Sequence, residues 1–479
     1  MHDAGARRLG LRDVVAVAVS AMVGVGIFFN PKDVAARAGD GPRTLLVWVL
    51  GGVVALLGAL TFAELGGRLP KAGGQFRVLR EAFGPRVGVT YMVVVGVVES
   101  SAAVGILAIV CGKFLAVACG MDPDAKPVPP LLGPVPPAML ILAAFGLAAM
   151  GVKQGAAALS VNVALKLLTA VLIIGLAIFG APDAAAHGGA SAAGAVDAVG
   201  AAGAAGAAGA AGTAADAART GGGFSLASFA WLAAFLPAFF AYGGFQQSLW
   251  IGGEVRDPER NLPRGIVIGV AIVVAVYVGL NAAYLRLLGY EGVAGAQAVA
   301  AEAAGVVFPW AGRATAAVVA WSAFGCMQAI LFTGPHQLVA LAEDGFAPRA
   351  LAVRTSRGAP VRAAACFAVV AAALAFLAGP GGVGLLLDAV VCVDWIFFTL
   401  TGVALFVLRR RTDLPLPFRV PGYPFVPALF VVAAALAAIS PFFDEQARLP
   451  GCVALGAVVV VGALASLRRK GVRAEGSSG

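Results

Sequence analysis

The chain has 479 residues, of which 60% are hydrophobic and 12% are charged, and its mean hydropathy is +0.91. Soluble domains carry about 25% charged residues, so this composition excludes a soluble globular protein. A net charge of +9 would suit a nucleic acid partner, but the positive residues lie at the ends of apolar segments and not on one face of a soluble domain. We therefore expect a lipid bilayer, and no nucleic acid, as a partner.

Apolar segments of about 17 to 30 residues follow one another along the chain, and each can cross a hydrocarbon layer of ~30 Å as a helix. They cover residues 11–31, 44–67, 86–112, 136–152, 155–180, 227–250, 264–288, 313–334, 361–379, 383–408, 423–443 and 450–467. The sequence therefore predicts an all-α integral membrane protein with 12 transmembrane helices.

The Lys and Arg residues predict the orientation of these helices, because positive residues accumulate on the cytoplasmic side. With an even number of spans, the two termini and the alternate loops lie on one side, which carries 24 of the 34 positive residues. The other side carries nine, and Lys166 falls within a span. We expect a multi-pass protein of the cell membrane, with the N-terminus (1–10) and the C-terminal tail (468–479) both cytoplasmic.

Residues 181–226 form a low-complexity segment made mostly of Ala and Gly, and we expect a flexible extracellular loop there. Elsewhere the sequence offers little reactive chemistry. Its six cysteines show no CxxC spacing, its three histidines are scattered, and it contains no HExxH motif or nucleophile elbow. We expect no metal, no cofactor and no enzymatic activity.

Two apolar segments carry glycines near their middle. The first contains Gly24-Val25-Gly26 and the sixth contains Tyr242-Gly243-Gly244, both roughly at mid-membrane. Close helix packing would explain either glycine pair alone. Unwound backbone persists at membrane depth only where it lines a cavity or is buried in protein, and paired interruptions in two halves point to a transporter's substrate site.

The broken ends would suit a zwitterion. The N-terminus of a half-helix offers unpaired N–H groups and a partial positive charge to a carboxylate, while freed carbonyl groups accept hydrogen bonds from an ammonium group. An amino acid carries both groups, so we expect it as the substrate. An ion channel would need a continuous polar pore or a filter ring, and neither is visible in the sequence.

The chain resembles the amino acid, polyamine and organocation superfamily of permeases, in particular its L-type amino acid transporter branch and bacterial relatives. The similarity runs from Leu11 to about Leu467. Six segments carry the similarity, and their order and spacing together are specific to the family. They are Gly24-Val25-Gly26-Ile27-Phe28, Ala63-Glu64-Leu65, Pro70-Lys71-Ala72-Gly73-Gly74, Phe240-Ala241-Tyr242-Gly243-Gly244, Glu254 to Pro263 and Phe418-Arg419-Val420-Pro421-Gly422-Tyr423-Pro424.

The resemblance implies the leucine-transporter fold, in which residues 11–180 and 227–408 form inverted repeats of five helices and residues 409–467 add two more. It implies that Gly24, Val25 and Gly26 offer amides to the substrate carboxylate. Carbonyl groups near Met22, and those of Phe240, Ala241 and Tyr242, would receive the amino group. Phe240 would gate the site and Gln246 would line the side-chain pocket. The implied substrate-binding residues are Met22, Val23, Gly24, Val25, Gly26, Ile27, Phe240, Ala241, Tyr242, Gly243 and Gln246.

Two residues depart from the pattern of the resembled family. Val25 stands where the family often has serine, so a hydroxyl contact to the carboxylate is absent. His336 stands where relatives usually carry arginine, which affects the cytoplasmic gate.

Charged residues inside the predicted spans are candidates for coupling, because a charge at the bilayer centre costs at least about 2.5 kcal/mol. Lys166 lies near the middle of the fifth span and would either carry a proton or hold carbonyl groups of the first span as a permanent cation. Glu99, in the third span, would pair with Lys166 or carry the proton itself. Asp388 and Asp394 are further candidates, and Asp394 belongs to a stretch that looks like family framework sequence.

We therefore expect a secondary active transporter that moves amino acids by alternating access. Proton symport and exchange of one amino acid for another remain alternatives. Apolar residues near the interruptions, such as Phe28 and Phe240, favour neutral amino acids, whereas Glu99 would favour a cationic amino acid or a polyamine. The sequence does not predict a partner subunit.

Overall fold

The computed structural model describes residues 9–69, 74–121, 137–149, 153–179, 234–249, 255–343, 347–353, 360–378, 383–411, 418–443 and 445–475. These residues form helices, and the only extended pairing among them is an isolated bridge between Leu9 and Val255. The predicted all-α class is confirmed for this part of the chain. The predicted loop at 181–226 and the side chain of His336 lie outside the described part.

Six helical stretches of the described chain are long and apolar enough to cross a membrane. The third predicted span is continuous but changes its winding within it. The helices concerned are α4 (Gly41–Arg68), α6 (Pro85–Val93) with η1 (Val94–Glu99) and α7 (Ser100–Ala118), α13 (Pro258–Gly295), α15 (Pro309–Thr333), α18 (Val383–Arg409) and α19 (Phe425–Ile439) with η6 (Ser440–Phe443).

Other helices lie in or beside the remaining predicted spans, so each span contains helix. They are α8 (Pro137–Ala149), α9 (Lys153–Phe179), α17 (Val361–Ala378), α20 (Glu445–Glu475), the set α1 (Leu11–Met22), α2 (Gly26–Phe29) and α3 (Pro31–Ala38), and the pair α12 (Phe235–Tyr242) and η3 (Phe245–Leu249). The helix α20 continues beyond the predicted end at residue 467. Helices that were not predicted lie between the spans, namely α5 (Gly74–Phe83), α14 (Val299–Val307), α16 (Pro335–Glu343) and η5 (Arg349–Ala352).

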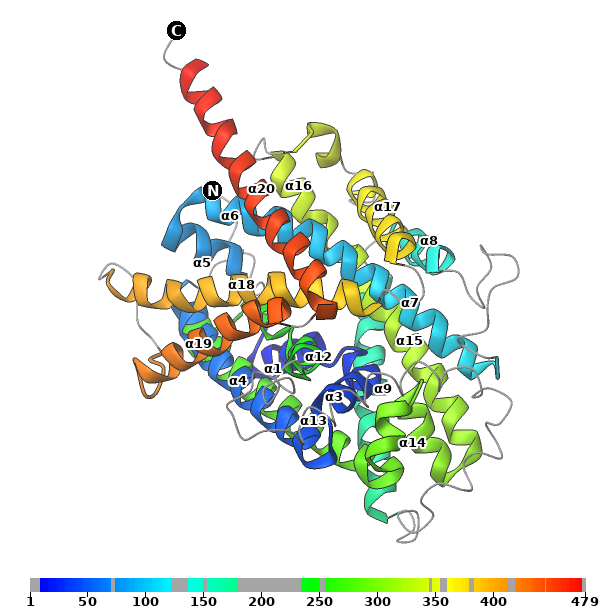
Figure 1. The fold of residues 1–479 in the computed structure, drawn as a ribbon. Helices are drawn as coiled ribbons and strands as arrows, with labels where there is room; N and C mark the ends of the chain where they lie inside the picture. Colours follow the sequence, from blue (N-terminus) through cyan, green and yellow to red (C-terminus); the bar gives the residue numbers. More distant parts are fainter. Residues whose placement is uncertain are drawn as a thin grey trace.

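The two interrupted helices lie in the middle of the molecule (Figure 1). The helix α1 packs against α13 and η3, and α12 packs against α4 and α18. A buried aromatic group fixes this arrangement, because the ring of Trp48 on α4 lies 5.8 Å from that of Tyr242 and 6.1 Å from that of Tyr277 on α13. The interruptions are therefore surrounded by protein, which is one of the two settings in which irregular backbone is tolerated within a membrane.

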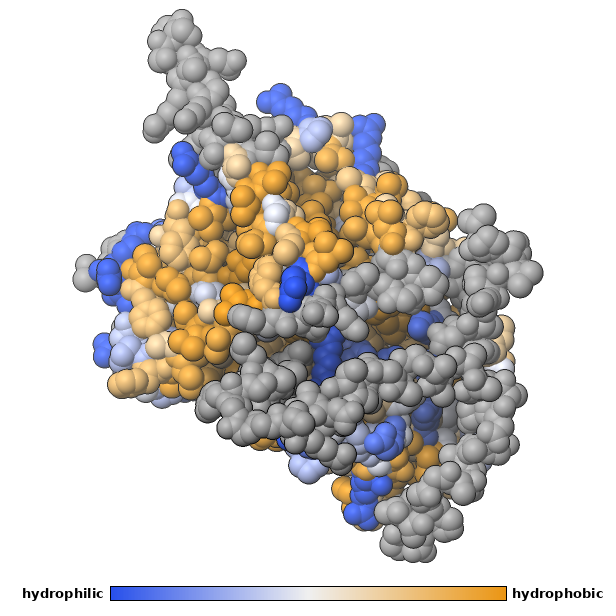
Figure 2. Space-filling model, viewed as in Figure 1, coloured by the Kyte–Doolittle hydropathy of each residue, from blue (hydrophilic) through white to orange (hydrophobic). Residues whose placement is uncertain are grey.

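The outer surface carries many large apolar side chains. Phe179, Phe376 and Phe425 are each at least 80% exposed, and Figure 2 shows one face of the molecule covered largely by hydrophobic residues. A soluble protein rarely leaves contiguous apolar surface of this extent in water. The surface is that of a multi-pass membrane protein.

Candidate functional site

The first interruption covers Val23, Gly24 and Val25, between the end of α1 and the start of α2. The amide of Gly24 turns back to donate to the carbonyl oxygen of Met22 at 2.7 Å. The following amides, those of Val25, Gly26 and Ile27, have no hydrogen-bond acceptor among the described residues. The donors available to a ligand at the start of this half-helix therefore begin one residue later than the resemblance implies.

The second interruption covers Gly243 and Gly244, between α12 and η3. Gly244 has φ of +109°, a backbone conformation that favours glycine. Its amide donates to Oε1 of Gln246 at 2.9 Å, so the Gln246 side chain is folded back onto the interruption. The carbonyl oxygens of Ala241 and Tyr242 accept no hydrogen bond from any described residue. Two acceptors are thus available at the end of α12.

The two interruptions touch each other. A Cβ atom added to Gly26 would lie 3.3 Å from Cα of Ala241 and 3.4 Å from Cδ1 of Phe240, and one added to Gly244 would overlap the carbonyl group of Ala21. Glycine at both positions allows this close approach. As a result, the unpaired amides of one chain segment and the unpaired carbonyl groups of the other belong to the same small region.

The half-helix after the first interruption is fixed to its neighbours at two points. Asn30, which links α2 to α3, donates from Nδ2 to the carbonyl oxygen of Pro237 on α12 at 2.8 Å. At the far end of α3, Arg37 forms an ion pair with the buried Asp388 of α18, with 3.6 Å between Nη2 and Oδ2. Asp388, a candidate for coupling by sequence, therefore pairs with an arginine of α3, just beyond the first predicted span.

Two side chains satisfy carbonyl groups that the first interruption frees. The buried Lys166 of α9 donates from Nζ to the carbonyl oxygen of Val23 at 3.0 Å and to Sγ of Cys326 on α15 at 2.9 Å. Tyr277 of α13 donates its hydroxyl to the carbonyl oxygen of Met22 at 2.8 Å. A lysine and a tyrosine from two different helices thus hold the unwound backbone.

Glu99 does not join this group. Its carboxyl group lies within hydrogen-bonding range of that of Asp394 on α18, whereas the partners of Lys166 are Val23 and Cys326. The expected pairing of Glu99 with Lys166 is therefore not formed. We call Glu99 and Asp394 the acidic pair.

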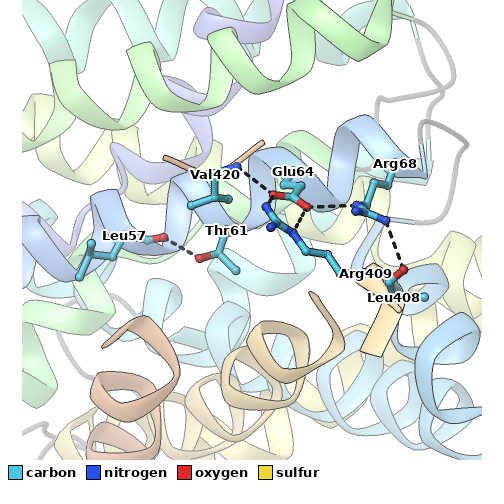
Figure 3. A network of polar contacts seen from close by, with 7 residues as sticks. All are labelled: Leu57, Thr61, Glu64, Arg68, Leu408, Arg409 and Val420. Carbon is cyan, nitrogen blue, oxygen red and sulfur yellow. Dashed lines mark hydrogen bonds and ion pairs between the residues drawn. The ribbon is translucent and has the colours of Figure 1, made fainter. Parts of the chain in front are cut away.

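A second cluster of charged groups lies at the end of α4, and we call it the Glu64 network (Figure 3). The carboxylate of Glu64, fully buried, accepts hydrogen bonds from the guanidinium groups of Arg68 and Arg409, the former at 3.1 Å, and from the amide of Val420 at 2.9 Å. Arg409 also stacks on the ring of Tyr423, 3.6 Å from its centroid. The network ties α4 to the end of α18 and to the segment before α19.

Sequence reasoning located the interruptions but missed several residues around them. Tyr277, Cys326 and Asn30 stand in apolar stretches without a motif, and only the fold brings them to the interruptions. Glu64 was noted as part of a signature without a role. The spacing of Glu64 and Arg68, four residues apart in an apolar helix, was the available signal for an ion pair.

The family model described as "Amino acid permease" matches residues 9–462. Among curated relatives, the b(0,+)-type amino acid transporter 1 of Mus musculus is 27% identical over 92% of this chain and 84% of its own length. The serine/threonine exchanger SteT of Bacillus subtilis is 26% identical over 89% of each chain. The large neutral amino acids transporter small subunit 2 of Mus musculus is 26% identical over 86% of this chain and 72% of its own length.

Proposed function

Since the chain belongs to the amino acid permease family, we propose that it is a secondary active transporter that moves neutral amino acids across the cell membrane by alternating access. One observation carries the proposal. The first interruption presents three unpaired amides, and the second interruption, in contact with it, presents two unpaired carbonyl groups. These are the groups that a carboxylate and an ammonium on one carbon atom would each require.

The binding geometry follows from these groups. The amides of Val25, Gly26 and Ile27 receive the substrate carboxylate, and the carbonyl groups of Ala241 and Tyr242 receive the ammonium. The structure supports this assignment because no protein group satisfies these atoms in the described chain. Met22, Val23 and Gly24 shape the same turn, and their carbonyl and amide groups are partly taken by one another, by Lys166 and by Tyr277.

The side chain of the substrate faces uncharged residues. Phe240, whose ring lies 6.4 Å from that of Phe29, covers the interruptions as a gate, and Gln246 and Gly243 lie on the second interruption. The cation nearest to the first interruption is Lys166, and its charge opposes a positively charged side chain there. A neutral amino acid fits better than a cationic amino acid or a polyamine.

For coupling, we propose that Lys166 acts as a permanent cation that holds the Val23 carbonyl group, and that Glu99 carries a proton. Lys166 already has its partners in the unwound backbone and in Cys326. Glu99 is engaged with a second acid and has no basic partner in the described part of the chain. One relative, the serine/threonine exchanger SteT, supports exchange of one amino acid for another as the alternative mode.

For topology, we propose twelve membrane crossings, inverted repeats at 11–180 and 227–408, and cytoplasmic termini. The support is that helix occurs in every apolar segment and that the two interruptions open the two halves. The distribution of Lys and Arg supports the orientation.

Uptake by the purified protein in liposomes tests the function. We expect saturable uptake of a labelled neutral amino acid such as serine or leucine, with weak competition by arginine and putrescine. Competition should require both the amino and the carboxyl group, so the substrate's methyl ester and its des-amino acid should both fail to compete. Equal competition by these derivatives, or uptake that does not saturate, would reject the assigned site.

A further inference from the structure

The third predicted span changes its helical winding next to an acid. Residues Val94–Glu99 are wound as a π-helix, and Glu99 is the last of them. Single π turns inside α-helices are rare and occur frequently at functional sites, because the additional residue redirects the side chains that follow it. This segment packs against α18, the helix that carries Asp394.

The contact between the two acids requires a proton. The carboxyl groups of Glu99, at the end of η1, and of Asp394, on the neighbouring α18, lie within hydrogen-bonding range of each other. An ionised carboxylate only accepts hydrogen bonds, so one member of the acidic pair must be protonated and donate to the other. Two ionised carboxylates in this contact would repel each other.

The surroundings offer no cation in place of the proton. Oε2 of Glu99 is inaccessible to solvent and has no hydrogen-bond partner among the described residues. No ion pair to either acid is found in that part of the chain. A metal site is equally absent there.

The neighbouring helices bring other groups to the acidic pair. Tyr91 of α6 is buried within electrostatic reach of both acids, and its hydroxyl donates to Oε1 of Gln75 on α5 at 3.3 Å. The thiol of Cys392, on α18, donates to the carbonyl oxygen of Ala438. Gln337 of α16 fills the space beside Gly96, and α20 contributes apolar side chains, including Ala454 and Val458.

A ring contact and a hydrogen bond connect the acidic pair to the second interruption. Trp395 follows Asp394 directly, and its ring lies 4.2 Å from that of Phe239 on α12. Phe239 in turn accepts, through its carbonyl oxygen, the amide of Gly243 in the second interruption. A change at the substrate site that moves α12 therefore reaches the residue beside Asp394.

We propose that Glu99 and Asp394 form one proton-binding site between η1 and α18, and that this shared proton is the one coupled to amino acid transport. The second half of the proposal rests on the proposed function. When α18 moves away from η1, the hydrogen bond between the acids breaks and the proton leaves to water. Two carboxylates then remain, and a proton from the other side restores the pair.

Infrared spectroscopy of the full chain in lipid tests the proton site without any substrate. We expect the C=O stretching band of a protonated carboxylic acid at neutral pH, shifted in D₂O. The band should be lost in Glu99→Gln and in Asp394→Asn. In each variant the new amide group donates the hydrogen bond, so the remaining acid is an ionised carboxylate and holds no proton. The control Glu81→Gln, which changes a half-exposed acid paired with Arg411, should keep it. A band that survives in either variant of the pair would overturn the site.

Transport in liposomes tests the coupling. With wild-type protein, an imposed pH gradient should drive accumulation of the amino acid, and both variants of the pair should lose this accumulation while keeping exchange of internal for external amino acid. Accumulation retained by the variants, or absent from a wild type that exchanges normally, would overturn the coupling role. If the wild type neither accumulates nor exchanges amino acids, the proposed function fails, and the infrared band still decides the proton site.

Discussion

The Nζ atom of Lys166 lies 3.0 Å from the carbonyl oxygen of Val23, where α1 ends. This contact joins α9 to the first interruption, because the lysine donates to an acceptor that helix formation would otherwise have used. Lys166 is 2% exposed and Val23 is 1% exposed, so bulk water does not reach this contact to take the place of the donor.

We predict that Lys166→Met weakens substrate binding by about 5- to 150-fold, because an unsatisfied buried acceptor costs ~1–3 kcal/mol and the unwound backbone loses its anchor. The measurement is the KM of uptake in liposomes at several pH values. Cys326→Ala is the control, since it removes the other partner of Lys166 and leaves the Val23 contact in place. A normal KM combined with lost pH dependence would instead make Lys166 the proton carrier.

Gly26→Leu should abolish uptake. The new side chain would enter the space held by Ala241 and Phe240, so the two interruptions would be forced apart. Gly146→Leu, on α8, is the matched control, because nothing lies within 4 Å of a Cβ atom at that position. Uptake and thermal unfolding of both variants are the measurements. Transport that survives in a folded Gly26→Leu protein would contradict the site.

Tyr277→Phe should raise KM by about five-fold, the equivalent of a hydrogen bond of ~1 kcal/mol. It removes the hydroxyl that donates to the Met22 carbonyl group and keeps the ring. Tyr284→Phe, two turns along the same helix, is a close control, because the buried Tyr284 hydroxyl has no partner in the described chain. Equal KM values for the two variants would show that the Met22 contact does not position the substrate.

Glu64→Gln should lower the free energy of unfolding by about 3–5 kcal/mol, the cost of leaving a buried charge without its partner. Arg68, whose side chain is 3% exposed, would retain its charge without the carboxylate that neutralises it. Thermal unfolding in detergent measures the loss, with Glu81→Gln as the exposed counterpart that should change it little. Similar melting temperatures for the two variants would show that the Glu64 network is not stabilising.

The parts of the architecture that depend on local sequence were predictable. The lengths of the apolar segments predicted helices, and the paired glycines predicted interruptions. The structure has an interruption after Met22 and another after Tyr242. These features need only neighbouring residues, because hydrophobic runs and glycine conformation act over a few residues.

The partners of the charged residues could not be predicted in the same way. Asp394 is far from Glu99 along the chain, and the sequence suggested either a pairing of Glu99 with Lys166 or a proton carried by Glu99 itself. Which side chain a buried charged residue contacts depends on how the helices are rotated and on the π turn that ends at Glu99. Neither feature can be recognised from the pattern of hydrophobic residues in the sequence. For a similar reason, the first unpaired amide in the structure is that of Val25 and not that of Gly24, because the Gly24 amide donates to the Met22 carbonyl group within the turn.

Gly244 has two separate requirements, a φ of +109° and contact with the Ala21 carbonyl group. Alanine would violate both, so no conservative replacement exists for this residue. In a library of random codon changes selected for growth on an amino acid, position 244 should therefore tolerate only synonymous codons. Position 24 should accept alanine, because a Cβ atom there would approach only backbone atoms, at 3.9 Å or more.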